Sequence, residues 1–254
     1  MKHSLSAYAV LAGALLCFVA FARFCPAKDV ENDLRRIDLS AWSPPPEDTA
    51  AMKNFLPPVV VPEEGPDTCS HRILLAGDSM AEGLRYRLSQ YATANGHTMQ
   101  VVVWYSSSSK YWAKTDTLSA FIRKFDPTYI FLCVGSNELF VRNLEERDAA
   151  VGEMIREIGD IPFIWIGPPN WKKDTGINDI LLQHCGKGRY YPSLRLRYQR
   201  TEDGAHPTLA SYNMWADSVS AWLRDSCAHP IRWEIPARNT PKTHGLTQLS
   251  PPKD

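Results

Sequence analysis

Short apolar runs alternate along this chain with longer segments in which apolar residues recur every three or four positions. The runs are Arg72–Ala76, Thr98–Trp104, Tyr129–Val134 and Pro162–Ile166. They are rich in β-branched and aromatic residues, as expected of strands that are buried on both faces of a sheet. The pattern therefore predicts four strands of this kind.

The intervening segments show the spacing of amphipathic helices. Their apolar faces are Met80, Leu84, Leu88 and Tyr91; Leu118, Phe121, Ile122 and Phe125; Leu144, Val151, Met154, Ile155 and Ile158; and Tyr212, Trp215, Val219 and Trp222. Gly96 and Pro127 follow the first two segments as stop signals. Alternating strands and helices predict an α/β fold, a flavodoxin-like three-layer sandwich with a mainly parallel sheet and helices on both faces.

Proline-rich segments flank this pattern, and no internal repeat occurs. Residues 26–68 contain "SPPPEDT" and "FLPPVVVPEEGPD", which are typical of an extended linker. Residues 229–254 hold few apolar side chains and predict a flexible tail. The folded domain is therefore predicted at residues 69–228.

Residues 1–25 have the pattern of a targeting segment. Lys2 and His3 precede the uncharged run Ser4–Ala22. Ala20-Phe21-Ala22 resembles a signal-peptidase site, but the run is also nearly long enough to span the roughly 30 Å core of a bilayer. A cleaved signal peptide and a retained membrane anchor both stay open. Either one predicts an extracytoplasmic location: periplasmic, secreted or tethered by this segment.

Composition and cysteine spacing narrow the function classes. Lys plus Arg and Asp plus Glu are both 28, so no basic face is indicated and nucleic acid is not expected as a partner. No metal-binding motif such as H-E-x-x-H or paired C-x-x-C occurs, and no cofactor is expected. Cys133 is expected to be buried, and Cys69 and Cys227, at the two ends of the domain, are expected to form a disulfide, with Cys185 as an alternative partner.

Reactive side chains gather where the predicted strands end, the edge at which parallel α/β sheets bind ligands. The junctions read Gly77-Asp78-Ser79, "WYSSSSKYW", Gly135-Ser136-Asn137-Glu138 and "GPPNW", and Asp203-Gly204-Ala205-His206-Pro207 precedes the last helix. Taken by itself, this junction could be a helix cap, because either Asp78 or Ser79 could accept the free N–H groups of a first helical turn. The other junctions hold what a nucleophilic serine needs: a histidine base, an orienting carboxylate and donors for an oxyanion.

The blocks G-D-S, G-x-N and D-x-x-H, in this order, resemble the SGNH (GDSL) hydrolase superfamily over about Arg72–Cys227. The resemblance implies that Ser79 is the nucleophile, His206 the general base and acid, and Asp203 the carboxylate that orients His206. A carboxylate three residues before a histidine in a tight loop can turn back to Nδ1 and leave Nε2 for the serine hydroxyl. The α/β-hydrolase fold is a weaker alternative because G-x-S-x-G is missing.

In this superfamily the oxyanion hole takes the backbone N–H of the nucleophile, an N–H from the second block and the third-block Asn. Ser79 and Asn137 match the first and last. The usual second-block glycine is replaced by the run 106–109, in which Ser109 is the best match and Ser108 the next. Asp78 is interpreted as structural, bonding N–H groups of nearby loops, and Glu138 is given no catalytic step.

The resemblance implies a serine esterase that works through an acyl-enzyme on a small-molecule or carbohydrate ester. Tyr111, Trp112 and Trp171 lie in polar company near the strand ends, which favours a sugar and predicts removal of O-acetyl groups from a carbohydrate. Alternatives are an O-acetyltransferase acting on cell-envelope polysaccharide, a lipase or arylesterase, and a binding module without activity. A membrane is expected as a partner only through residues 1–25.

Overall fold

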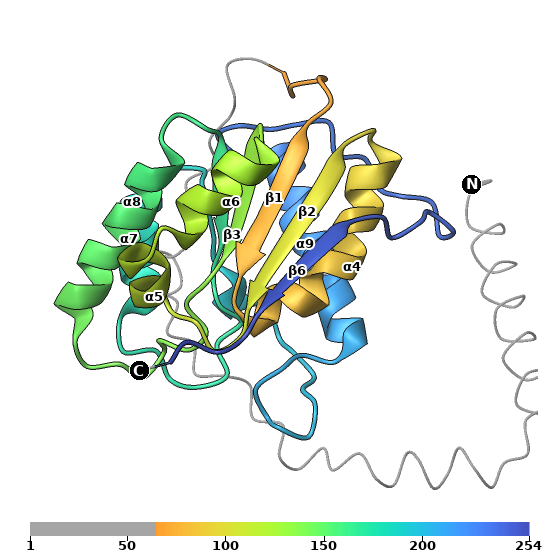
Figure 1. Cartoon of the computed structure of the whole chain (residues 1–254). Coiled ribbons are helices and arrows are strands. Elements are labelled where there is room, and N and C mark those ends of the chain that lie inside the picture. The colour runs from red at the N-terminus through yellow and green to blue at the C-terminus, as the bar shows by residue number, and fades with distance from the viewer. Residues whose placement is uncertain (1–64, 254) are drawn as a thin grey trace, which may run out of the picture. The chain divides into compact units, whose positions relative to one another are not determined.

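A parallel β-sheet forms the centre of the structure (Figure 1). The computed structural model describes residues 65–253, so the predicted targeting segment and the linker up to residue 64 lie outside the described part. The strands are β1 Arg72–Gly77, β2 Thr98–Trp104, β3 Tyr129–Cys133, β4 Phe163–Ile166, β5 Tyr190–Tyr191 and β6 Gly245–Leu249. Their order is β5-β4-β3-β1-β2-β6, and all neighbours are parallel. The first five strands have the flavodoxin-like order, which confirms the predicted fold class.

Helices cover both faces of this sheet. They are α4 Ser79–Ala94, α5 Ser109–Lys114, α6 Thr117–Phe125, α7 Leu144–Ile158, α8 Ile177–Cys185 and α9 Leu209–Asp225, with the short 3₁₀ helix η2 Ser193–Arg195. In β1, Ile73 and Leu75 pack toward α4 and α9, whereas Leu74 and Ala76 pack toward α5, α6, α7 and α8. This alternation gives the three layers, and it explains why the strand has no polar side in the sequence.

The predicted apolar helix faces are mostly buried. All four predicted residues of α4 and all four of α9 belong to one core cluster. In α6 only Leu118 is fully buried, while Phe121, Ile122 and Phe125 are partly exposed. Helix α6 therefore buries less of its predicted apolar face than α4 and α9 do.

Two helices were missed because their sequence signals are local. In α8, the carboxylate of Asp174 accepts the N–H groups of Gly176 at 2.9 Å, Ile177 at 3.0 Å and Asn178 at 3.1 Å. An Asp three residues before the apolar pair Ile177 and Ile180 is a helix-start signal that could have been read. Helix α5 is a short segment within the serine-rich junction and carries too few residues to show a period.

The segment after residue 228 is part of the folded domain, so the prediction of a flexible tail is wrong. Trp233 is completely buried, stacks on Tyr91 with ring centroids 5.8 Å apart, and donates its Nε1–H to Ser220 Oγ at 2.9 Å. Strand β6 then extends the sheet beside β2 (Figure 1). The sequence concealed this packing because the buried residues Ile231 and Trp233 lie among prolines and polar residues without a helix or strand period.

Replacing that indole tests the role of the C-terminal segment. We expect Trp233→Ala to lower the free energy of unfolding by about 3–5 kcal/mol, the usual cost of removing a buried aromatic ring. Ile235→Ala is the matched control, since Ile235 is 69% exposed and its loss should cost less than about 0.5 kcal/mol. Denaturant unfolding measures both. Equal stability of the two variants would show that the segment is not part of the core.

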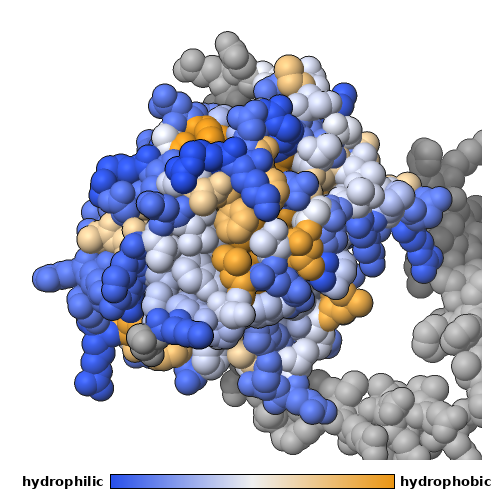
Figure 2. All heavy atoms as spheres, in the orientation of Figure 1, coloured by the Kyte–Doolittle hydropathy of each residue, from blue (hydrophilic) through white to orange (hydrophobic). Residues whose placement is uncertain are grey.

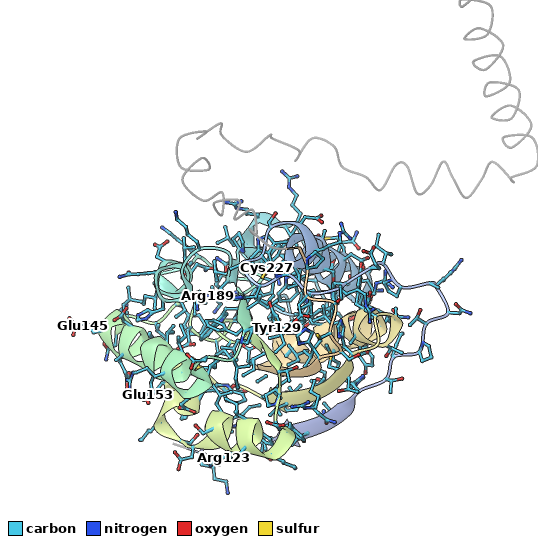
Figure 3. The ribbon with its side chains drawn as sticks, turned by 90° about the horizontal axis from the view of Figure 1, so that it is seen from above. Arg123, Tyr129, Glu145, Glu153, Arg189 and Cys227 are labelled. Atoms are coloured by element: carbon cyan, nitrogen blue, oxygen red, sulfur yellow. The ribbon has the colours of Figure 1, made fainter. Side chains whose placement is uncertain are left out.

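The expected disulfide between Cys69 and Cys227 is wrong. Cys69, Cys133, Cys185 and Cys227 are all free thiols. The segments that flank the predicted domain do meet, because the Asp67 N–H donates to the Pro230 carbonyl at 2.9 Å. Cys227 nevertheless points into the core, where its Sγ lies 3.5 Å from the hydroxyl of Tyr129 (Figure 3), and Cys69 is exposed. Cys133 and Cys185 are buried, and burial raises the pKa of both thiols.

The outer surface is mainly polar, with small hydrophobic patches on the face shown in Figure 2. The exposed large apolar side chains are Phe140, Leu209, Ile235 and Leu246. Within residues 65–253, no helix has the length and apolar character needed to cross a bilayer.

Candidate active site

The structure brings Ser79, His206 and Asp203 into one hydrogen-bonded chain. The Ser79 Oγ lies 2.8 Å from His206 Nε2, and His206 Nδ1 lies 2.5 Å from Asp203 Oδ2. Ser79 is the first residue of α4, at the carboxyl end of β1, and the other two lie in the loop before α9. Such a chain can remove the proton from a serine hydroxyl and stabilise the imidazolium that results. The catalytic role of the three residues stays a prediction.

The loop that carries the histidine is held by the same carboxylate that orients it. Asp203 Oδ1 accepts the N–H groups of Ala205 at 2.8 Å and His206 at 2.9 Å and the Thr201 hydroxyl at 2.9 Å, which leaves Oδ2 for the imidazole. The hydrogen bonds from His206, then Ala205 and Thr201, hold the pKa of the Asp203 carboxyl well below its usual range. These hydrogen bonds therefore favour the ionised form of Asp203 beside the imidazole ring.

Arg200 fixes this loop against its neighbour and was missed in the sequence. Its guanidinium donates to the Ala205 carbonyl within the loop and, from Nη2, to the carbonyls of Pro169 at 2.5 Å and Asn170 at 2.8 Å after β4. One side chain thus ties the histidine loop to the next strand junction. The sequence holds no signal for it, because its partners are backbone carbonyls far along the chain.

The turn before the nucleophile is built on buried groups. A Cβ on Gly77 would lie 2.3 Å from the Cys133 carbonyl oxygen, so only glycine lets β1 approach β3 here. Asp78 is fully buried; it accepts the Met80 N–H at 2.9 Å, and the Ser136 hydroxyl at 2.6 Å. Burial raises the pKa of the Asp78 carboxyl, and these hydrogen bonds oppose the rise.

This geometry settles which residue caps α4. Asp78 is the N-cap, and Ser79 is the first helical residue, with its hydroxyl directed to His206. The interpretation of Asp78 as structural is confirmed, since its carboxylate joins the loop after β1 to the loop after β3. The capping explanation for Ser79 is wrong.

Asn137 lies beside the serine-rich junction after β2. Its Nδ2 donates to the Ser107 carbonyl at 2.9 Å, and an amide nitrogen carries a second hydrogen. Its neighbour Ser136 is fixed to Asp78. The contact with Ser107 holds the Asn137 side chain against the loop after β2, and its role as an oxyanion donor stays a prediction.

The prediction that Ser109 donates to the oxyanion is wrong. Ser109 is fully buried, and both its N–H, at 2.9 Å, and its hydroxyl, at 2.7 Å, donate to the carboxylate of Glu138. Ser108, the alternative, is the N-cap of α5, and its N–H has no acceptor among residues 65–253. The chain reaches this position through Ser106, whose φ of 57° is the left-handed conformation that usually favours glycine.

The Glu138 carboxylate holds the start of α5 in place through its contacts with Ser109. The carboxylate is completely buried and lies 3.0 Å from Arg147 Nε, with the two hydrogen bonds from Ser109 completing its contacts. Burial raises the pKa of Glu138, while Ser109 and Arg147 oppose the rise. These contacts join the loop after β3 to α5 and α7, so Glu138 supports the loop that carries Ser109.

The three aromatic residues predicted to bind substrate have different surroundings. Trp112 is completely buried, with Nε1 donating to Ser107 Oγ at 2.9 Å, so its assignment is wrong. Tyr111 is partly buried 6.3 Å from the ring of Trp104, and Trp171 is partly buried. A substrate role for Tyr111 and Trp171 stays a prediction.

Trp171 could support the loop that carries Asn137 or bind the substrate, and a substitution can distinguish these two roles. Its Nε1 donates to the Ser136 carbonyl at 2.9 Å, next to Asn137. We expect Trp171→Phe, which keeps a ring but loses this donor, to lower kcat for an aryl acetate by about two- to tenfold, the equivalent of one hydrogen bond. Steady-state kinetics on aryl and sugar acetates measure this. A loss confined to sugar acetates would contradict the supporting role and assign Trp171 to substrate binding alone.

A cavity of about 380 Å³ opens beside the triad and was not foreseen. It is lined by Ser79, Glu82, Gly83, Tyr105, Thr201, His206, Pro207 and Tyr212. A larger cavity of about 660 Å³ lies at the amino ends of the strands, next to His71 and Tyr129, and therefore away from this chemistry. Residues 65–253 contain no group of three His, Cys, Asp or Glu side chains that could hold a metal ion.

Known proteins offer only a weak structural similarity to this chain. No protein-family model matches the sequence. No curated protein matches it either. Among solved structures, a gut microbial diltiazem-metabolizing enzyme is similar with a TM-score of 0.28 and 16% identity over 76% of this chain. The chain spans 38% of that protein, and a similarity this weak does not identify an activity.

Proposed function

We propose that the protein is a serine ester hydrolase of the SGNH type, acting through an acyl-enzyme. The observation that carries the proposal is the continuous chain Ser79 Oγ, His206 Nε2, His206 Nδ1 and Asp203 Oδ2, with contacts of 2.8 Å and 2.5 Å. A serine hydroxyl at a helix start with a histidine base in reach is the arrangement that nucleophilic catalysis requires.

The residues present support each step of acyl transfer. His206 takes the hydroxyl proton as Ser79 Oγ attacks the ester carbonyl, and the carbonyl oxygen becomes an alkoxide. The N–H groups of Ser79 and Ser108 and the free N–H of Asn137 stabilise this charge. His206 then returns its proton to the leaving alcohol, and a water molecule, deprotonated by the same ring, releases the acid and restores the Ser79 hydroxyl.

For the substrate, we propose a short acyl group, acetyl, on a carbohydrate alcohol. The cavity of about 380 Å³ beside Ser79 and His206 is at the small end of ligand sites, which favours a compact alcohol such as a single sugar unit. The pattern of residues 1–25 supports an extracytoplasmic site of action, where such glycans occur. Transfer of the acetyl group to a sugar hydroxyl uses the same residues and is the second candidate.

A panel of acetyl, butyryl and long-chain esters, each assayed with and without a sugar acceptor, tests this proposal. We expect acetyl esters to be cleaved fastest, with acetate released to water. Acetylated sugar formed faster than free acetate would identify a transferase. A preference for acyl chains of eight or more carbons would contradict the acetyl assignment, and no turnover of any ester would indicate a binding module.

A further inference from the structure

The cavity beside the triad combines a carboxylate with aromatic walls. Glu82 lies one helical turn after Ser79 on α4, and its side chain is 35% exposed. Tyr105, at the end of β2, lines the same cavity, as does Tyr212 on α9. No step of the proposed ester hydrolysis uses Glu82 or these rings.

Glu82 is held in place by neighbours that leave part of the carboxylate open. The Tyr105 hydroxyl donates to Oε2 at 2.8 Å, and Gln248 Nε2, from β6, lies 3.3 Å from Oε1 and 2.6 Å from the Tyr105 hydroxyl. A carboxylate offers about four acceptor positions, so it can accept further hydrogen bonds. Arg85 lies 3.8 Å away and offsets part of the negative charge.

The cavity also has an apolar wall, which depends on a glycine. A Cβ on Gly83 would lie 2.3 Å from the Tyr212 ring, so the ring approaches α4 this closely only because residue 83 has no side chain. Pro207 continues this wall next to His206. A carboxylate facing aromatic and aliphatic carbon suits a molecule with hydroxyl groups on one side and C–H groups on the other.

The position of the cavity relative to His206 indicates whether the acyl half or the alcohol half of an ester enters it. The leaving oxygen must lie within hydrogen-bond reach of His206 Nε2, because it receives the proton from that atom. The oxyanion donors Ser108 and Asn137 do not line this cavity, whereas His206 and Pro207 do. The alcohol half of the ester therefore belongs on the Glu82 side.

We infer that this cavity is the alcohol subsite and that Glu82 accepts a hydrogen bond from a hydroxyl of a polyhydroxylated leaving group, such as a monosaccharide unit; the inference rests on the proposed esterase function. Tyr105 and Gln248 position the carboxylate. The C-terminal strand thus contributes to substrate selection through Gln248, although it lies far in sequence from Ser79.

A cationic alcohol, such as choline, the leaving group of acetylcholine, is the competing occupant of an acidic aromatic cavity. The ion pair with Arg85 favours a neutral hydroxyl, because part of the charge of Glu82 is already compensated. The two occupants respond differently to substitution. Glu82→Gln keeps a hydrogen-bond acceptor but removes the charge, whereas Glu82→Ala removes both.

The test measures kcat/KM for an acetylated monosaccharide, acetylcholine and 4-nitrophenyl acetate in the wild type, Glu82→Gln and Glu82→Ala. We expect Glu82→Ala to lower the ratio of sugar-acetate to aryl-acetate kcat/KM by about 10- to 100-fold, as for loss of a hydrogen bond to a charged group, and Glu82→Gln to lower it less. Glu145→Ala, an exposed residue on α7 (Figure 3), is the matched control and should leave the ratio unchanged. The free monosaccharide should inhibit wild type more strongly than Glu82→Ala.

Three results would overturn the inference. An unchanged ratio in Glu82→Ala would show that Glu82 does not contact the alcohol. Acetylcholine as the preferred ester, with Glu82→Gln as damaging as Glu82→Ala, would assign the cavity to a cation. Absence of turnover for all three esters would reject the esterase function itself, whereas turnover of 4-nitrophenyl acetate together with a sugar-acetate kcat/KM that does not depend on Glu82 would reject the subsite alone.

Discussion

Ser79→Ala and His206→Ala should each lower ester hydrolysis by a factor on the order of 10⁵ or more, because nucleophile and base act as one unit. Without the Ser79 hydroxyl no acyl-enzyme forms, and without His206 Nε2, 2.8 Å from Ser79 Oγ, the hydroxyl keeps its proton. Initial rates on 4-nitrophenyl acetate measure the loss.

The same variants should remain folded. Ser79 and His206 both lie at the surface of the cavity rather than in the core, so we expect their free energies of unfolding to stay within about 0.5 kcal/mol of wild type. Thermal unfolding provides this control. Near-normal turnover by Ser79→Ala would contradict the proposed mechanism.

Asp203→Asn and Asn137→Ala should each lower kcat by about 10²- to 10⁴-fold, the range for loss of an orienting carboxylate or of one oxyanion donor. The pKa of Asp203 is held well below its usual range, so the residue is ionised at working pH and an amide removes a full charge from beside His206. Asn137→Ala removes the side-chain N–H beside the Ser107 carbonyl.

Single-turnover and steady-state kinetics on the same acetate distinguish a loss of transition-state stabilisation from a loss of substrate binding. Both variants should lose kcat with little change in KM, since both groups act on the transition state. An Asp203→Asn variant with wild-type kcat would mean that His206 is oriented by its loop alone. A change in KM only would place Asn137 in ground-state binding.

The sequence predicted those parts of the fold that depend on local pattern. Leu74 and Leu75 lie on opposite faces of β1 and are both buried, and this is visible as an apolar run. Trp233 was missed because a single buried ring in a proline-rich segment has no period. Cys227 was misread because its side-chain direction depends on the packing of Tyr129.

In the candidate site, too, residues with a local sequence signal could be predicted, whereas residues placed by distant contacts could not. Ser79, Asp203 and His206 could be grouped in advance because the G-D-S and D-x-x-H blocks lie at junctions on the sheet edge where parallel strands end, and the structure brings the three side chains together. Ser109 was misassigned because the position of Glu138, 29 residues later, decides where its N–H points. Trp112 has polar neighbours in sequence but packs inward, and Glu82, Tyr105 and Gln248 meet only through the sheet.

Covalent labelling tests the central claim most directly. A fluorophosphonate probe reacts with a serine whose hydroxyl is activated by a base, and digestion followed by mass spectrometry locates the adduct. We predict one adduct per chain, on Ser79, in the wild type and none in His206→Ala. An adduct on another serine, such as one of residues 106–109, or an unlabelled Ser79 in a preparation that hydrolyses esters, would contradict the assignment.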